Sequence, residues 1–205
     1  MTLARVFEQT GEYEVIIADG GSNDKTLDEV KKYRQIKTIT AKQGRASQMN
    51  AGASLAKGEW LLFLHADALL PVDAINIIQR QSVQAGGFRH RFSNNTWGLR
   101  FVSWLHNLRC SLTGVFYGDQ AMFIRHSLFV EMGGFPDVDN LEDLLFGEQL
   151  VSITTPVFLE QEVLSDSRKF EKQGVWISLL RVIFIQICHE LKLPIPQKKF
   201  FANVR

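Results

Sequence analysis

Apolar and polar positions alternate in blocks that predict strands and helices in turn along the first half of the chain. Three short apolar or β-branched runs are typical of buried strands: 14–18 (EVIIA), 36–40 (IKTIT) and 60–64 (WLLFL). Three segments with helical spacing of apolar residues follow them: 24–33, 45–57 and 71–84. This alternation indicates an α/β fold with a mostly parallel central sheet flanked by helices.

The second half of the chain is less regular, but it continues the same mixture of strands and helices. Three runs are read as further strands: 88–92, 121–124 and 156–159. Three segments are read as helices: 96–112, 141–151 and an amphipathic C-terminal helix over 175–193. No repeat or linker divides the sequence, so we expect residues 1–205 to form a single domain.

Two of these helices carry prominent apolar stripes. The first stripe consists of Trp97, Phe101, Trp104, Leu105 and Leu108. The second consists of Trp176, Leu179, Leu180, Ile183, Phe184 and Ile187, and is surrounded by Lys169, Lys172, Arg181, Lys192, Lys198 and Lys199. The second stripe could cover the core, pair with another copy of the chain, or rest on a membrane surface. The apolar-rich segment 175–188 is shorter than the roughly 20 residues that span a bilayer.

Composition narrows the class of protein further. Apolar residues make up 45% and charged residues 22%, which is typical of a soluble globular chain. The net charge of +1 gives no reason to expect nucleic acid as a partner. Cys110 and Cys188 are far apart and match neither a disulfide framework nor a CxxC metal site. With no signal peptide at the N-terminus, a cytoplasmic location is expected.

Acidic side chains follow two of the predicted parallel strands. Asp19 comes after EVIIA and Asp67 comes after WLLFL, and ligands of open α/β sheets bind beyond such strand ends. Each aspartate could instead be a turn or helix-capping residue. Gly44 and Arg45 open the next helix, where backbone N–H groups and a guanidinium could contact a diphosphate. The sequence contains no Walker loop and no GxGxxG motif.

Further candidates lie in the second half. Glu142 and Asp143 begin an apolar helix, where they could complement the helix dipole or supply a general base. Asp119 precedes a predicted strand, and the pair Arg168-Lys169 could meet phosphate. Among the histidines, only His65 lies close enough to Asp67 in the sequence to share a cation. We expect three other histidines to be structural or surface residues: His90, His106 and His189.

Four segments occur in this order along the chain: EVIIADGGSNDKT, GRASQMNAGASLAKGEWLLFLHAD, GDQAMFIRHSLFVEMGGFP and LED. Together they resemble an inverting family-2 glycosyltransferase with a GT-A (Rossmann-like) fold, and the resemblance covers 14–174. It is closest to small bacterial single-domain members whose metal motif reads His-Ala-Asp. The resemblance implies that the sugar comes from a nucleotide-diphosphate donor and is transferred to a hydroxyl acceptor, which could be lipid-linked.

The resemblance also implies roles for individual residues. Asp143 is the implied catalytic base, and Asp67 with His65 is the implied metal site. The implied substrate and nucleotide contacts are Asp19, Gly20, Ser22, Gly44, Arg45, Asp119 and Glu142. The metal is expected to be Mn²⁺ or Mg²⁺. An imidazole in place of the first carboxylate favours Mn²⁺, because nitrogen is the softer ligand.

The chain departs from the family at its N-terminus. Only 13 residues precede EVIIA, and none resembles the apolar first strand and nucleotide-contacting turn of the family. The chain is therefore expected to be N-terminally truncated relative to the family. Two alternatives to a glycosyltransferase stay open: a catalytically inactive nucleotide-sugar-binding protein, and a nucleotidyltransferase. Peripheral contact with the inner face of a membrane and a homodimer are further expectations.

Overall fold

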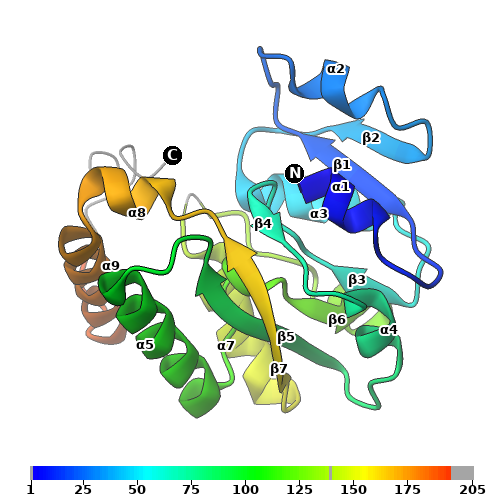
Figure 1. Ribbon diagram of the computed structural model, residues 1–205. Coiled ribbons are helices and arrows are strands. Elements are labelled where there is room, and N and C mark those ends of the chain that lie inside the picture. Colours follow the sequence, from blue (N-terminus) through cyan, green and yellow to red (C-terminus); the bar gives the residue numbers. More distant parts are fainter. Residues whose placement is uncertain (1, 139, 195–205) are drawn as a thin grey trace.

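The computed structural model describes residues 2–138 and 140–194 (Figure 1). Its strands are β1 (Val15–Asp19), β2 (Ile36–Thr40), β3 (Trp60–Leu62), β4 (Ala68–Leu69), β5 (Ala85–Phe92), β6 (Phe123–Arg125) and β7 (Val157–Ser165). Its α-helices are α1 (Thr2–Phe7), α2 (Thr26–Val30), α3 (Arg45–Leu55), α4 (Ala74–Gln79), α5 (Trp97–Thr113), α6 (His126–Glu131), α7 (Glu142–Ile153), α8 (Arg168–Gln173) and α9 (Val175–Glu190). A short 3₁₀ helix, η1 (Gly118–Gln120), precedes β6.

The strands form two separate sheets. β1 and β2 pair in parallel, and the remaining five have the order β3-β6-β5-β7-β4. Within the five-stranded sheet only β5 and β7 are parallel, whereas β3–β6, β5–β6 and β4–β7 are antiparallel. The α/β class is confirmed, but the expectation of a mostly parallel sheet is wrong. Hydrophobic periodicity identifies a strand without giving its direction, which the connections decide.

Most predicted elements are present, with shifted ends. The helix predicted over 96–112 is α5, which begins after Thr96 and ends at Thr113, where Gly114 with φ of 70° caps it. The helix predicted over 71–84 is reduced to α4, because Asp73 adopts a left-handed conformation just before it. The C-terminal helix ends at Glu190 rather than 193. Three short helices and one two-residue strand were not predicted: α1, α6, α8 and β4.

The buried side chains lie on both faces of the five-stranded sheet. Alternate residues of the segment that contains β3 face opposite ways: Leu61 and Phe63 join one hydrophobic cluster, and Leu62 joins the other. The first cluster includes residues of α3, α6 and α7, and the second includes residues of α1, β4 and α4. Burial on both faces explains why WLLFL is uniformly apolar instead of alternating.

Side-chain amides complete the backbone hydrogen bonding where strands separate. Asn107 of α5 accepts from the His90 N–H at 2.8 Å and donates to the His90 carbonyl at 2.9 Å, beyond the point where β6 stops pairing with β5. Gln48 of α3 donates to the Ala18 carbonyl on β1 at 2.9 Å. These contacts satisfy buried backbone groups that would otherwise be costly, and they fix α5 and α3 against the strands.

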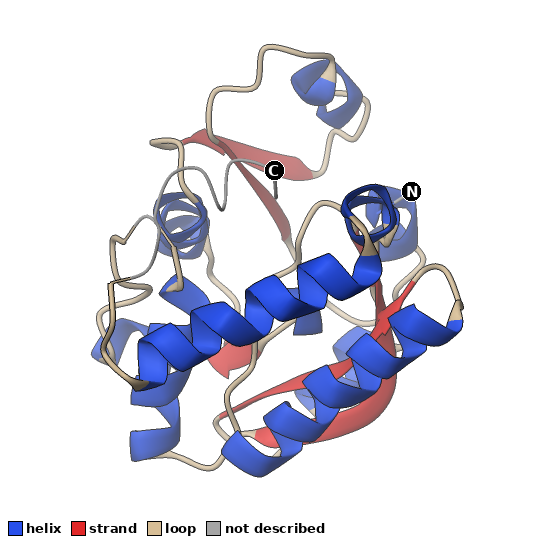
Figure 2. Cartoon of the chain, turned by 90° about the vertical axis from the view of Figure 1, so that its left-hand side faces the viewer, coloured by secondary structure: helices blue, strands red, loops and turns tan. Residues whose placement is uncertain are grey.

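The helices α5 and α9 lie side by side on the face of the molecule that Figure 2 turns toward the viewer. They cover the end of the sheet formed by β5 and β7 (Figure 1). Across residues 2–138 and 140–194, every helix is too short or too polar to cross a lipid bilayer.

Candidate functional site

A cavity of about 720 Å³ collects candidate residues from four separate segments. Its lining includes Arg45 at the start of α3, His65 and Asp67 in the turn after β3, Asp119 in η1, and Asp143 in the first turn of α7. The volume falls within the range of small-molecule sites. The fold therefore brings the implied base, the implied metal residues and the implied diphosphate contact to one place.

Gly118 contacts both the Asp143 carboxylate and the His65 ring. Its N–H donates to Asp143 Oδ2 at 3.0 Å, and Asp143 Oδ1 accepts from the Leu144 N–H at 2.9 Å. A Cβ on Gly118 would lie 2.4 Å from His65 Nε2. The absence of a side chain at position 118 thus allows the His65 ring and the Asp143 carboxylate to approach the same backbone segment.

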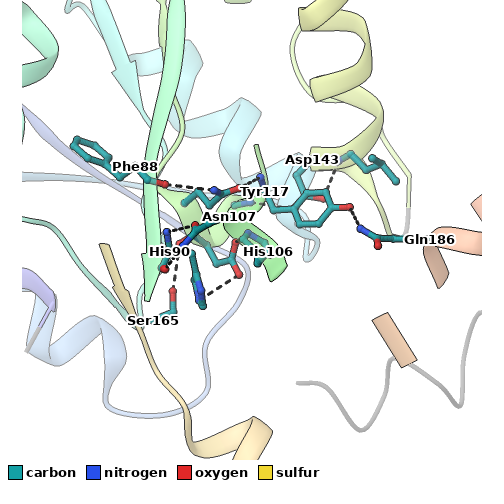
Figure 3. Close-up of polar contacts among 12 residues, drawn as sticks. Phe88, His90, His106, Asn107, Tyr117, Asp143, Ser165 and Gln186 are labelled. Carbon is teal, nitrogen blue, oxygen red and sulfur yellow. Dashed lines mark hydrogen bonds and ion pairs between the residues drawn. The ribbon is translucent and has the colours of Figure 1, made fainter. Parts of the chain in front are cut away.

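Figure 3 shows His90 and His106 near each other, and Asp119 lies against both histidines. His106 Nε2 is 3.4 Å from Asp119 Oδ1, and His90 Nε2 is 3.7 Å from Asp119 Oδ2. Burial raises the pKa of the Asp119 carboxyl, but His106 and His90 outweigh it, and the net pKa lies far below the usual range. Burial lowers the pKa of His90 to about 4, so at neutral pH its ring is uncharged.

The sequence-based interpretation of His106 and His90 as structural or surface residues did not foresee that both meet Asp119. Both line the cavity together with Asp119. The sequence carries one signal for this cluster, because Ser103, His106 and Asn107 follow one another at helical spacing. On α5 the buried face carries Ser103 and Asn107 close to His106, while the aromatic residues lie on the other face. Buried polar side chains need hydrogen-bond partners, so a polar stripe on the inward side of a helix predicts a cluster of polar contacts there.

The buried His90 predicts that stability depends on pH in a defined window. Its pKa is about 4 in the folded protein and about 6.5 in an unfolded chain. The unfolded state therefore binds the proton first, so the free energy of unfolding should fall as pH decreases from 6.5 to 4, by up to roughly 3 kcal/mol. Above pH 6.5 this contribution is fully present.

Urea unfolding at pH 7.5, 6.0 and 5.0 measures this effect. His90→Phe removes the titrating group, so its free energy of unfolding should change less between these pH values than that of the unchanged chain. Asp119 does not interfere, since its lowered pKa affects stability only below about pH 4. Equal pH dependence in the two proteins would show that His90 is protonated as easily in the folded state as in the unfolded state.

Arg45 lines the cavity and also forms an ion pair with a buried carboxylate. Arg45 Nε lies 2.5 Å from Glu142 Oε1, and the Glu142 side chain is 2% exposed. Burial raises the pKa of Glu142, and the charge of Arg45 opposes that rise. Glu142 lies outside the cavity lining, so its direct contact is with Arg45.

Asp19 and its neighbours lie outside this cavity, at the end of β1 in the two-stranded sheet. The Asp19 carboxylate accepts from the Gly21 N–H at 3.0 Å and from the Ser22 N–H at 3.0 Å. The hydrogen bonds from Ser22 and Gly21 lower the pKa of Asp19. Gly20, Ser22 and Gly44 are likewise outside the cavity lining. The carboxylate is ionised and fixed by its own turn, as an Asx turn requires.

His65 and Asp67 offer an incomplete set of metal ligands. Burial, with help from Arg45, lowers the pKa of His65 and favours the neutral imidazole that a metal needs. Asp67 is exposed and adds a carboxylate oxygen. Within the part of the chain that the structure describes, no three His, Cys, Asp or Glu side chains are placed to hold a metal together. The two residues fit a cation that takes its other ligands from water and phosphate, as Mg²⁺ often does.

The two residues of the predicted phosphate-binding pair Arg168-Lys169 have different surroundings. Lys169 lines the cavity, together with Asp166 and Ser165. Arg168 turns to Asp166, with Nη2 at 2.5 Å from Oδ2, and this pair raises the pKa of Arg168. Of the sequence-predicted pair, only Lys169 is therefore placed toward the cavity. Lys198 and Lys199 of the predicted basic border lie outside the described residues.

Comparison with known proteins places the chain in a family. The profile of the family described as "Glycosyl transferase family 2" matches residues 1–128, which is more than half of the chain. The chain belongs to this family. The match includes the segments that carry Asp19, Arg45, His65, Asp67 and Asp119.

Two curated relatives are PGL/p-HBAD biosynthesis glycosyltransferases, from Mycobacterium bovis and Mycobacterium tuberculosis. Each is 32% identical to this chain over 139 residues, which cover 61% of this chain and 52% of the relative. The chain thus spans about half the length of the curated relatives it matches.

Solved structures share the fold. A mannosyltransferase from Pyrobaculum calidifontis in complex with GDP-Man and Mn²⁺ has a TM-score of 0.63 and 19% identity, covering 98% of this chain and 61% of that one. Glucosyl-3-phosphoglycerate synthase from Mycobacterium tuberculosis, in complex with Mn²⁺ and UDP-glucose, has a TM-score of 0.56 and 12% identity, covering 88% and 69%. The fold is therefore of the GT-A glycosyltransferase type, as expected.

Proposed function

We propose that this protein transfers a sugar from a nucleotide-diphosphate donor to a hydroxyl acceptor, with inversion at the anomeric carbon. The observation that supports this most directly is the single cavity lined by Asp143, Asp119, His65, Asp67 and Arg45. A base, a diphosphate-binding cation and metal ligands are the groups that this reaction needs. Membership of glycosyl transferase family 2 supports the same reaction class.

In this proposal Asp143 accepts the proton of the acceptor hydroxyl. The N–H of Gly118 and the N–H of Leu144 each bond one of its oxygens and fix the direction of the carboxylate. Those bonds leave further lone pairs on both oxygens for the acceptor. The resulting alkoxide-like oxygen attacks the anomeric carbon from the face opposite to the leaving diphosphate, which gives inversion.

Arg45 acts at the donor side, where its guanidinium lies against the diphosphate and Glu142 holds it in place through the ion pair. Asp19, with the turn of Gly20 and Ser22, binds the nucleoside at the end of β1. Gly44 opens the helix above the diphosphate. A Mn²⁺ or Mg²⁺ ion held by His65 and Asp67 would supply Lewis-acid stabilisation of the leaving diphosphate.

Calorimetry with UDP-, GDP- and TDP-sugars, each with and without Mn²⁺, tests the donor half of the proposal. Binding of one of these donors, strengthened by Mn²⁺, is the expected result. Product analysis then separates the reaction classes, because a glycosyltransferase releases a nucleoside diphosphate and a nucleotidyltransferase releases pyrophosphate. Donor binding without any turnover would favour an inactive nucleotide-sugar-binding protein, and no binding at all would overturn the proposal.

Gly118→Ala tests the arrangement of the site itself. The new Cβ would overlap the His65 ring, so we expect His65 to shift and sugar transfer to fall by roughly 10²-fold. Gly52→Ala in α3 is a matched control, because a Cβ there would lie 3.8 Å from the Ala18 side chain and meet no close contact. Rates for both variants, with circular dichroism to verify folding, measure the effect. Equal rates would mean that His65 does not need its present position.

A further inference from the structure

The helix α5 carries its aromatic residues on the outside. Trp97 is 72% exposed and Trp104 is 55% exposed, while Ser103 and Asn107 are buried on the opposite face. Leu112, in the last turn of the helix, is 77% exposed. Large apolar side chains in contiguous exposed groups mark an interaction surface.

The neighbouring helix α9 continues this surface. Trp176, Leu180, Phe184 and Ile187 are exposed and follow one another at helical spacing along one side. Trp176 meets α5, with ring centroids 5.4 Å from Trp97 and 6.0 Å from Phe101. Phe101 in turn lies 5.8 Å from Trp104. We call these four residues the aromatic patch: Trp97, Phe101, Trp104 and Trp176.

The cavity with Asp143 and Asp119 has apolar walls supplied by the same two helices. The wall residues of α5 are Leu105, Leu108 and Leu112, and those of α9 are Leu179, Val182 and Ile183. Leu108, Leu112 and Val182 are at once part of this wall and among the exposed apolar residues of the surface. Through these residues the cavity adjoins the exposed apolar face of α5 and α9, and its lining also includes the carboxylates of Asp119 and Asp143.

The charges beside this face are mainly positive. On α5, which has no acidic residue, Arg100 is exposed, whereas the Arg109 guanidinium turns inward over the Tyr117 ring at 3.7 Å. The helix that precedes α9, α8, carries Lys169 and Lys172 together with one glutamate, and its Arg168 is paired with Asp166. Exposed tryptophans next to cationic side chains are the composition of a surface that rests in the interface of an anionic lipid bilayer.

We infer that the aromatic patch docks on a lipid surface and that the cavity between α5 and α9 takes an acceptor whose hydroxyl-bearing head is attached to an apolar chain. The apolar chain lies along the leucine and valine wall, and the hydroxyl reaches Asp143. This inference rests on the proposed function, and it adds the class of the acceptor and the place from which it enters. A lipid surface fits better than a second copy of the chain, because two copies would bring like charges of α5 and α8 together.

Sedimentation with vesicles tests the docking surface on the full chain. The probes are vesicles of phosphatidylcholine alone and of phosphatidylcholine with phosphatidylglycerol at 3:1. We expect binding to the anionic vesicles, reduced at least fivefold in Trp97→Ser/Trp104→Ser. The control Val72→Ser/Val130→Ser removes two exposed apolar residues elsewhere on the molecule and should bind as the unchanged chain does. Equal binding of the patch variant, or no binding of the unchanged chain, would overturn the docking surface.

A matched pair of ligands tests the cavity. n-Dodecyl β-maltoside, below its micelle-forming concentration, carries the same sugar head as maltose with an apolar chain added. Calorimetry should show binding of the maltoside at least tenfold tighter than binding of maltose. Val182→Trp narrows the apolar wall and should remove this difference without weakening vesicle binding. If Val182→Trp leaves the affinity for the maltoside unchanged, then the cavity is not where the apolar chain of the ligand binds.

Two further readouts keep the outcomes separate. Binding of UDP- and GDP-sugars is measured on every variant, and its absence in the unchanged chain contradicts the proposed function whatever the vesicles show. If the unchanged protein binds a donor sugar normally but binds no lipid, this result contradicts the lipid-docking inference and leaves the proposed function standing. Analytical ultracentrifugation completes the set: a dimer that Trp97→Ser/Trp104→Ser abolishes would assign the patch to self-association and overturn the lipid surface.

Discussion

Replacing Asp143 with asparagine should reduce sugar transfer by about 10²- to 10⁴-fold, which is the usual contribution of a general base. Asparagine keeps the shape of the side chain, and its amide oxygen can still accept from the Gly118 N–H that now bonds Asp143 Oδ2, at the cost of the bond from the Leu144 N–H within the same turn. The fold of this segment should therefore survive. What disappears is the ability to take a proton from the acceptor hydroxyl, so the loss should appear in the turnover rate rather than in donor affinity.

Steady-state kinetics together with calorimetric donor binding measures this result. Asp137→Asn is a suitable control, because Asp137 is an exposed carboxylate that forms only a surface ion pair with Lys42 at 3.7 Å. We expect donor affinity in Asp143→Asn to stay within about threefold of the unchanged chain. Loss of donor binding with an intact fold would reassign Asp143 to the donor site. Unchanged turnover would show that Asp143 is not the base and would make Asp119 the next candidate.

The second large effect is expected at the pair of Arg45 and Glu142. Arg45→Met should weaken binding of UDP or GDP by about 10- to 100-fold, the range for losing a charge-assisted hydrogen bond. It should also reduce the free energy of unfolding by about 1–3 kcal/mol, because Glu142 is buried and would lose its cation. The pKa of Glu142, already raised by burial, should rise further.

The double variant Arg45→Met/Glu142→Gln separates the two roles of Arg45. Removing the carboxylate charge relieves the unpaired buried group, so the stability measured by urea unfolding should largely recover. Nucleotide affinity measured by calorimetry should stay low, since the guanidinium is still missing. If nucleotide affinity recovers together with stability, then Arg45 serves the fold and not the diphosphate.

The sequence alone predicted the elements that carry strong periodicity. EVIIA, IKTIT and WLLFL became β1, β2 and β3, and α5 differs from its predicted range by one residue at each end. Strand direction was not predictable, because antiparallel pairing of β6 with β3 and β5 depends on contacts distant in the sequence. Short elements such as β4 and α6 form mainly through tertiary packing, which overrides local preference.

The candidate site was predictable from the sequence at positions that a motif marks. It was not predictable at positions that only the packing of distant segments brings together. Asp67 and Asp143 were identified from their positions after a strand and at a helix start, and they do line one cavity. His106 and His90 were missed, because their meeting with Asp119 is created by the docking of α5 on β5. The aromatic stripe of α5 was recognised, but periodicity does not reveal that Trp97 and Trp104 face outward.

The strand pairing also bears on how this protein behaves in concentrated solution. In the part of the chain that is described, β1 pairs only with β2 and β3 pairs only with β6. Each of these apolar strands therefore has one side on which no neighbouring strand continues the sheet. Such edges are templates for pairing with other chains. Purified material should gel or precipitate through intermolecular sheet growth as its concentration rises, and charged substitutions along β1 would slow that process.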